Sequence, residues 1–181
     1  QIIENCTFGE LKTGELPFFD IEYVFIKLRS KSIGEVATVN LLCPDDKKTR
    51  VEVDINLDEV ECVRDVSHNA DIKLTDDVGI VLEYPRIASL AEMTKVSDSE
   101  AGFAIVKSCI SQIYDKENVY AKSDMDKKEL DEFIDSLSHT QFEKVQQFFD
   151  TMPKVKHSVK VKNPNTGIES EVVVEGMQNF F

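Results

Sequence analysis

The sequence predicts an α+β protein in which helices and antiparallel hairpins come in runs along the chain. Apolar residues repeat with the period of a helix after Pro17 and again between positions 100 and 152. In three other segments they alternate with polar residues at a period of two. Such runs favour an α+β arrangement over a parallel βαβ sheet. We therefore expect an N-terminal helix with antiparallel β-hairpins, a helical block of three to four helices, and a C-terminal β-hairpin.

The length of 181 residues suits one domain, or one domain with a small appendage. We predict three segments: 1–85 with the N-terminal helix and hairpins, 86–153 with the helical block, and 154–181 with the last hairpin and a short tail. No long Gly, Ser or Pro linker separates them, so we expect one compact unit. Because the sequence begins at Gln1 and not at Met, we expect that N-terminal residues of the full protein precede it.

The N-terminal helix is predicted to begin at Pro17, a residue that suits a helix start. Asp20 then places a carboxylate near the positive end of the helix dipole, and Gly34 is predicted to end the helix. A helix that is apolar on more than one side lies between layers or in an interface. Here one stripe consists of Ile21, Val24, Phe25 and Leu28, and a second of Phe19, Tyr23 and Ile26.

Two hairpins are predicted to follow this helix. Residues 35–43 and 51–57 alternate in polarity on either side of the turn residues 44–48, which indicates one buried and one solvated face. A weaker pattern predicts a second hairpin from 72–74 and 80–84.

The helical block is predicted from spacing and start signals. A short helix is expected from Ile87 to Met93, and a longer one carries Phe103, Val106, Ile110 and Ile113 on one stripe. Further helices are predicted to begin near Ser123 and at Ser138, where Ser138 and Gln141 form a capping box.

The C-terminal segment returns to a period of two, with a turn at 163–167. Four lysines alternate along its first strand, and we interpret them first as a solvated strand face and second as an anion site: Lys154, Lys156, Lys160 and Lys162. The tail Met177–Phe181 is short and amphipathic, and its two phenylalanines are predicted to dock on the protein.

Composition excludes several classes of protein. A net charge of −13 without a basic patch disfavours nucleic acid and anionic lipid. No apolar run approaches the roughly 20 residues that a membrane helix needs. The four cysteines are scattered without a CxxC pair, which favours reduced thiols over disulfides.

Catalytic motifs are absent from the sequence: there is no phosphate-binding Gly-rich loop, no GxSxG and no HExxH. Paired carboxylates such as Asp45-Asp46 lack the spacing of a Ca²⁺ loop and are interpreted as turn residues. We therefore predict no catalytic residues and no cofactor. A Cys-dependent or metal-binding enzyme built on Cys43 and His157 stays an alternative, since catalytic groups need only meet in space.

Two turns share an internal similarity, Cys43-Pro-Asp-Asp-Lys47 and Asn163-Pro-Asn-Thr-Gly167. Zinc ribbons bind their ion with two Cys-Pro-x-Cys-Gly turns of this kind. The four ligand positions hold Cys43, Asp46, Asn163 and Thr166, and one thiolate cannot make a structural Zn²⁺ site. We predict two turns of zinc-knuckle shape without metal, in which Asn and Asp hydrogen-bond the backbone instead.

Three stretches, together with the C-terminal segment, resemble the baseplate hub subunit and hub assembly catalyst family of T-even-like contractile-tailed phages. The stretches are Asn5-Cys-Thr-Phe-Gly9, the run from Leu16 to Glu35, and Cys43-Pro44. The ending also fits, with Phe148-Phe149, Met152-Pro153, His157, the turn 163–167 and Glu175-Gly176 before Phe180-Phe181. Some relatives have fuller Cys-Pro-x-Cys knuckles, and this chain departs from them there.

The resemblance implies a non-enzymatic structural or assembly role in the tail baseplate hub, exerted through protein–protein contacts. It implies host cytoplasm during assembly and the virion baseplate as locations, and other baseplate or hub proteins as partners, with tape-measure protein and a homo-oligomer left open. A transient chaperone for hub or tape-measure proteins is the alternative. Candidate interface residues are Phe18, Phe19, Tyr23, Ile26, Phe180 and Phe181.

Overall fold

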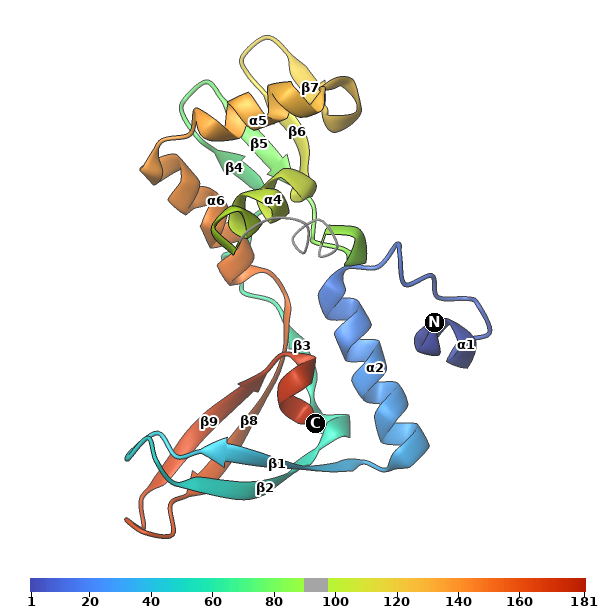
Figure 1. Cartoon of the computed structure of the whole chain (residues 1–181), viewed down its shortest axis with the longest axis vertical. Helices are drawn as coiled ribbons and strands as arrows, with labels where there is room; N and C mark the ends of the chain where they lie inside the picture. Colours follow the sequence, from blue (N-terminus) through green and yellow to red (C-terminus); the bar gives the residue numbers. More distant parts are fainter. Residues whose placement is uncertain (90–97) are drawn as a thin grey trace. The chain divides into compact units, whose positions relative to one another are not determined.

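The computed structural model describes residues 1–89 and 98–181, with side chains from residue 101 onward after the gap. The chain forms two compact units, and each is treated by itself (Figure 1). Unit 1 comprises Gln1–Val63 and Pro153–Phe181, and unit 2 comprises Arg64–Met152. The predicted boundary at residue 85 differs from this division, because the strands of the second hairpin form one sheet with strands that follow position 109. The helix expected from Ile87 to Met93 lies largely outside the described residues.

Unit 1 consists of two antiparallel sheets, three helical turns or helices that pack on them, and a short N-terminal helix. One sheet has the order β1-β2 and the other β3-β8-β9. Both predicted hairpins of this unit are therefore confirmed. The helical elements are α1 (Ile2–Cys6), α2 (Phe18–Ile33), η1 (Leu57–Glu59) and η3 (Met177–Phe180); the strands are β1 (Val36–Leu42), β2 (Arg50–Asn56), β3 (Glu61–Val63), β8 (Lys154–Lys162) and β9 (Glu169–Glu175).

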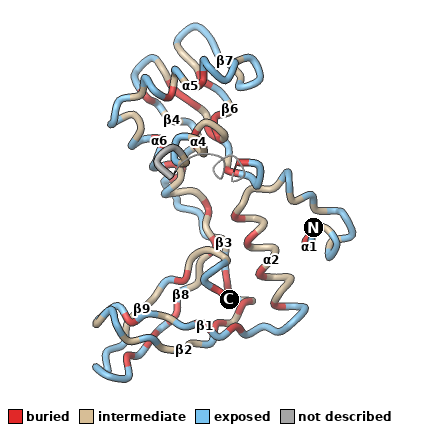
Figure 2. The backbone as a smooth tube through the Cα atoms, in the orientation of Figure 1, coloured by how far each residue is buried: buried red, intermediate tan, exposed pale blue. Residues whose placement is uncertain are grey.

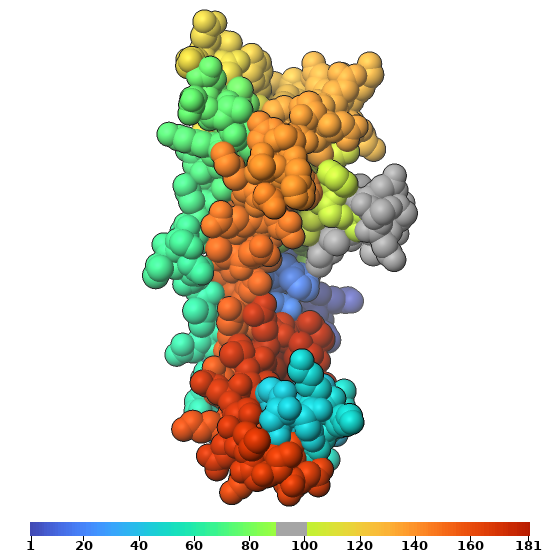
Figure 3. Space-filling model, turned by 90° about the vertical axis from the view of Figure 1, so that its left-hand side faces the viewer, coloured from blue at the N-terminus to red at the C-terminus, as the bar shows by residue number. Residues whose placement is uncertain are grey.

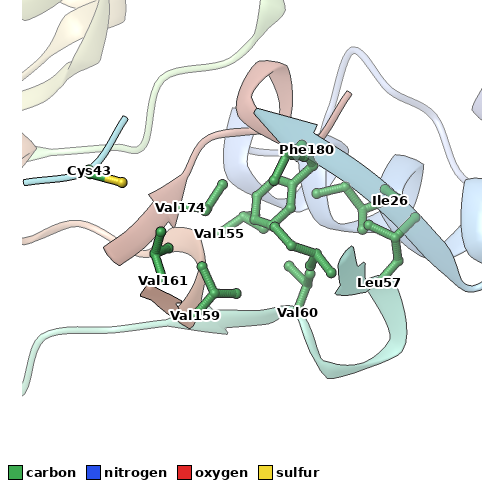
Figure 4. Packing of buried hydrophobic residues seen from close by; sticks show 12 residues of the cluster. Ile26, Cys43, Leu57, Val60, Val155, Val159, Val161, Val174 and Phe180 are labelled. Carbon is green, nitrogen blue, oxygen red and sulfur yellow. The ribbon is translucent and has the colours of Figure 1, made fainter. Parts of the chain in front are cut away.

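The core of unit 1 forms where the two hairpins bury their inward faces (Figure 2). Alternate residues of β1 and β8 point inward, and Figure 3 shows the β1–β2 hairpin in cyan against the C-terminal hairpin in red. The Phe180 side chain of η3 lies among side chains of α2, η1 and β8 (Figure 4). The fully or almost fully buried members include Ile26, Ile55, Leu57, Val60, Val155, Val161 and Phe180.

The lysines of β8 form a solvated strand face, which is the first of the two interpretations given for them. Lys156, Lys160 and Lys162 stand opposite glutamates of β9 in the antiparallel register. Cross-strand pairs of opposite charge stabilise a sheet modestly. The Lys154 ammonium also lies 3.1 Å from the Glu175 carboxylate, so these lysines act as partners of β9.

Helix α2 begins after Pro17 and ends before Gly34, as predicted. Its buried face consists of Phe19, Glu22, Ile26 and Ser30, so the stripe that begins at Ile21 is only partly buried. The stripes of the sequence analysis did not include Glu22 or Ser30, and both of these buried polar groups have partners inside the unit. Glu22 accepts the backbone N–H of Met177 at 3.1 Å, and Ser30 Oγ donates to Asp58 at 2.7 Å.

Lys27 fastens the same helix to the η1 turn. Its ammonium donates to the backbone carbonyls of Leu57, Asp58 and Val60 at 3.2, 2.7 and 2.9 Å. Leu57 and Asp58 lie in the η1 turn, and Val60 follows it directly. One side chain therefore satisfies three acceptors and fixes the chain between β2 and β3.

Unit 2 is a four-stranded antiparallel sheet of order β4-β5-β6-β7 with helices packed on it. The range 86–153 contains the helices α4, α5 and α6, as the predicted helical block requires, but the strands β6 and β7 also lie within it, which the prediction missed. The strands are β4 (Asp71–Lys73), β5 (Gly79–Leu82), β6 (Ile110–Tyr114) and β7 (Val119–Ala121); the helices are α4 (Asp98–Cys109), η2 (Lys122–Asp124), α5 (Lys127–Asp135) and α6 (His139–Thr151).

A β-bulge explains why β6 looked helical in the sequence. Ile113 pairs with Ile80, and Ile110 pairs with Leu82, with a register shift between Val81 and Leu82. The extra residue on β6 brings both isoleucines to the buried side although they are three positions apart. A spacing of three is also what a helical stripe produces, so the pattern alone could not separate the two structures.

The predicted start of α5 at Ser123 is wrong by three residues. Asp126 is the N-cap: its carboxylate accepts the Glu129 N–H at 2.8 Å, and the Glu129 carboxylate accepts the Asp126 N–H at 2.9 Å. Ser123 lies in η2. The capping box predicted for Ser138 and Gln141 at α6 is confirmed.

None of the helices within the described ranges has the length and apolarity that a membrane crossing requires.

The two caps give a direct test of the corrected helix start. We expect Asp126→Ala to lower the free energy of unfolding by about 1 kcal/mol, since the backbone N–H of Glu129 loses its acceptor. Ser123→Ala should change it by less than about 0.5 kcal/mol, as at other surface positions. Urea denaturation followed by far-UV circular dichroism measures both. If Ser123→Ala lowers the free energy of unfolding more than Asp126→Ala does, Ser123 and not Asp126 is the N-cap of α5.

Candidate assembly sites

The two turns that resemble zinc knuckles meet in unit 1, and a carboxylate joins them. Asp45, in the turn after β1, accepts the Asn163 amide through both of its oxygens at 3.0 Å. It also accepts the Thr166 hydroxyl at 2.6 Å. Asn163 is 1% exposed, whereas Asp45 and Thr166 are exposed, so the contact between the two hairpins has one buried partner and a carboxylate that faces water. We call the two turns, 43–49 and 163–167, the turn junction.

Each turn also holds its own backbone by hydrogen bonds. The Asp46 carboxylate accepts the N–H groups of Lys48 and Thr49, both at 3.0 Å. Asn163 Oδ1 accepts the N–H of Asn165 at 2.9 Å, and the Asn165 amide donates to Thr49 Oγ1 at 2.9 Å. These are the backbone-binding roles predicted for Asp and Asn in the turns.

The hydrogen bonds act on the acidity of both aspartates. Donation by Thr166 and then by Asn163 lowers the pKa of Asp45 below its ordinary value of 3.8. Donation by the Thr49 hydroxyl and by the N–H groups of Thr49 and Lys48 lowers the pKa of Asp46 strongly. Both carboxylates are therefore charged acceptors at neutral pH.

The four predicted knuckle residues have different roles in this geometry. Asn163 and Thr166 face the opposite turn, whereas Asp46 serves its own turn and Cys43 is buried with the core. Asp45, which joins the turns, was not among the predicted four. Across the part of the chain that the structure describes, no group of three or more His, Cys, Asp or Glu side chains could hold a metal ion.

Cys43 and His157, the pair behind the enzyme alternative, do not hydrogen-bond to each other in the described structure. Cys43 is 1% exposed and lies at the end of the core cluster near Val161 (Figure 4). Burial, and then the charges of Asp45 and Asp46, raise the pKa of its thiol. A thiol held in its neutral form is a poor nucleophile and a poor metal ligand.

The six predicted interface residues fall into two groups. Phe19, Ile26 and Phe180 are buried within unit 1, so they are occupied by the chain's own packing. Phe18 and Tyr23 are half-buried. Phe181 is 53% exposed and lies edge-on to Phe25, with ring centroids 6.0 Å apart. Of the tail, Phe180 docks in the core, and Phe181 keeps about half of its surface exposed while its ring contacts Phe25.

An apolar groove lies between α1 and α2. It has a volume of about 350 Å³ and is lined by Ile2, Cys6, Phe25, Leu28, Arg29, Lys31, Ser32 and Ile33. Ile2 and Ile33 are exposed although they are large and apolar. The sequence signal for this groove was the partly buried stripe of α2 that contains Phe25 and Leu28.

His68, in unit 2, is a buried polar group although it lies in the polar segment Ser67-His-Asn69. Its ring stacks with Tyr84 at 5.5 Å and packs on Phe148 at 4.9 Å, measured between centroids. Its Nδ1 lies 3.0 Å from Thr151 Oγ1, whose own hydrogen is donated to the Gln147 carbonyl, so Nδ1 carries the proton. Nε2 has no hydrogen-bond partner among the described residues, and burial lowers the pKa of the ring.

The turn junction is satisfied within the chain, and the groove between α1 and α2 is apolar surface of the kind found at protein interfaces. A family model described as T4 bacteriophage base plate protein matches residues 1–181, the whole chain. The chain therefore belongs to the T4 base plate protein family, and the resemblance to T-even-like baseplate proteins is confirmed at this level. No curated protein and no solved structure matches the chain.

The turn junction predicts an acid-dependent contribution to stability. Because its hydrogen bonds lower the pKa of Asp45, this contribution is complete above the ordinary value of 3.8 and is lost as pH falls through the lower folded-state value. We expect Asp45→Asn to lower the urea midpoint at neutral pH, and the difference from wild type to shrink as pH approaches about 2. The exposed Glu10→Gln, also in unit 1, is the control. A difference that is independent of pH would contradict the assignment.

His68 predicts a second pH dependence with its own window. The folded protein favours the neutral ring, while the unfolded chain binds a proton near the ordinary pKa of 6.5, so stability falls as pH drops below that value. Between about pH 7.5 and 5.5 the urea midpoint of wild type should fall more than that of His68→Gln. The exposed His139→Gln should behave as wild type. Equal slopes for His68→Gln and wild type would contradict the prediction.

Proposed function

We propose that this chain is a structural or assembly protein of the phage baseplate hub and acts through protein–protein contacts. The family match over all 181 residues carries the proposal. Two observations support it. The raised pKa of Cys43 keeps its thiol neutral, and the polar residues of the turn junction are used in hydrogen bonds between the two turns. On this proposal the chain needs no cofactor, and its action on partners is assembly and not covalent chemistry.

The location and the partners follow from the same proposal. The chain is made in the host cytoplasm and joins other baseplate or hub proteins, with the virion tail baseplate as its final place. The charge of −13 favours basic protein surfaces over nucleic acid or anionic membrane. Phe18, Tyr23 and Phe181 remain the proposed contact residues, because each keeps surface outside the core.

The test is a phage in which the gene for this chain carries a nonsense mutation. We expect non-permissive hosts to yield heads but no tails with complete baseplates, as seen by negative-stain electron microscopy, with infectivity restored by the wild-type chain from a plasmid. Normal contractile tails from the mutant would contradict the proposal. Mass spectrometry of purified wild-type particles then separates a resident component from a transient chaperone, which would be absent from them.

A further inference from the structure

Among the residues that the structure describes, no strand pairs with one of the two edges of β1. Strand β1 pairs with β2 alone, and the bonds that flank the ladder fix which residues face each side. The Cys43 N–H donates to Thr49 at 2.8 Å and the Leu57 N–H to Glu35 at 2.7 Å, so the odd-numbered residues of β1 bond to β2. The N–H and C=O groups of the even-numbered residues, 36 to 42, therefore point to the open edge.

The contacts on that edge agree with this direction. The Arg50 guanidinium donates to the Asn40 carbonyl at 3.2 Å. The N–H groups of Thr38 and Asn40 have no partner among the described residues, and both residues are exposed. The edge thus offers two strand-type donors spaced two residues apart, as a neighbouring strand would require.

Strand β9 has an open edge of the same kind. The Gly176 N–H donates to Val155 at 3.0 Å and the Asn163 N–H to Ile168 at 2.9 Å, so the even-numbered residues of β9 bond to β8. Val173 and Glu175 therefore point outward. Asn179 donates to the outward carbonyl of Glu175 at 2.7 Å, which agrees with this direction.

A groove of about 550 Å³ is bounded by these two edges. Consecutive residues of each strand line it, so it runs along the backbone edges and not over one face of a sheet. Four lining residues of β1 span about 13 Å at the rise of a strand, which is room for a short extended segment. The lining residues are Thr38, Val39, Asn40, Leu41, Val173, Val174, Glu175, Gln178, Asn179 and Phe181.

The composition of β1 distinguishes it from the other edges of unit 1. Its seven residues, Val-Ala-Thr-Val-Asn-Leu-Leu, include no charge and no proline, in a chain that is 30% charged. Proteins protect lasting edges with charged residues, proline or bulges, because an unprotected edge recruits another strand. By contrast β2 carries Arg50, Glu52 and Asp54, and β9 carries three glutamates. Arg50 contacts the Asn40 carbonyl and η3 lies beside the strand, so the part of the β1 edge left for a partner is the pair of N–H groups of Thr38 and Asn40.

We propose that β1 accepts an extended segment of another baseplate protein as an added strand, paired with the backbone of Thr38 and Asn40. This rests on the proposed function. The segment carries alternate apolar side chains, which face the buried side with Val39 and Leu41, and basic residues, which complement the carboxylates of β2. A second copy of this chain is disfavoured as the occupant, since two chains of −13 repel each other.

The experiment complements the nonsense-mutant phage with plasmid-borne variants and measures the yield of infectious particles. Asn40→Pro removes the outward N–H and places a ring on the edge, while the preceding Val39 is already extended as proline requires. We expect a yield lower by roughly tenfold or more, because the added strand loses a donor and a place to lie. Asn40→Ala keeps the N–H and should complement. Glu52→Pro removes the outward N–H of the residue opposite, on the other edge of the hairpin, and should also complement.

Each other outcome overturns the proposal. If Asn40→Pro gives a yield of infectious particles within about twofold of wild type, the edge is not used. If Asn40→Ala lowers the yield as much as Asn40→Pro does, the contact is made by the Asn40 side chain and not by the backbone. Sedimentation equilibrium that finds a wild-type dimer and an Asn40→Pro monomer assigns the edge to a second copy. Thermal melting verifies that each variant folds, and Thr38→Pro, with the same outward N–H, replaces Asn40→Pro if that variant does not. Normal tails from the nonsense mutant would instead contradict the proposed function itself.

Discussion

Unit 1 depends on the burial of two hairpins from opposite ends of the chain against each other. Neither hairpin is stable alone in water, since a two-stranded sheet exposes both of its faces. Val39 and Ile55 of the first hairpin share one core with Val155 and Val161 of the last, and Phe180 fills the space beside them. Because this packing fixes which side of each hairpin is inward, it also fixes which backbone edges remain open.

In the turn junction, hydrogen bonds hold two hairpin turns together, as a bound metal ion does in a zinc ribbon. A metal site would draw both turns toward one cation and gain free energy from the bonds to it. Here Asp45 is the central group and is an anion, and Asn163 and Thr166 donate to it from the other turn. The polarity of the site is thus inverted, with an acceptor at the centre and donors around it.

Local patterns were sufficient for much of the fold, and the failures have physical causes. The helix Phe18–Ile33 and the hairpins were predictable because their caps and alternation lie within a few residues. Strand β6 was not, because a bulge gave Ile110 and Ile113 a helical spacing. Asp45 was missed for a related reason: its partners Asn163 and Thr166 are distant in sequence, and nothing near position 45 distinguishes it from Asp46. His68 likewise sits in a polar segment, and only Tyr84 and Phe148 bury it.

The same core gives the open edge of β1 the rigidity that selective recognition needs. A one-residue slip of a strand exchanges its two faces, so an edge recognises a register only if its own faces are fixed. Ala37 and Val39 are buried in the core. Their burial fixes the strand, so the backbone N–H groups of Thr38 and Asn40 keep pointing to the open edge. An added strand of alternating polarity would then have one favourable register, and its wrong register would place polar side chains against apolar ones. The β1 strand therefore retains specificity without charged residues of its own, because its selectivity comes from the fixed direction of its backbone groups and from the carboxylates of β2.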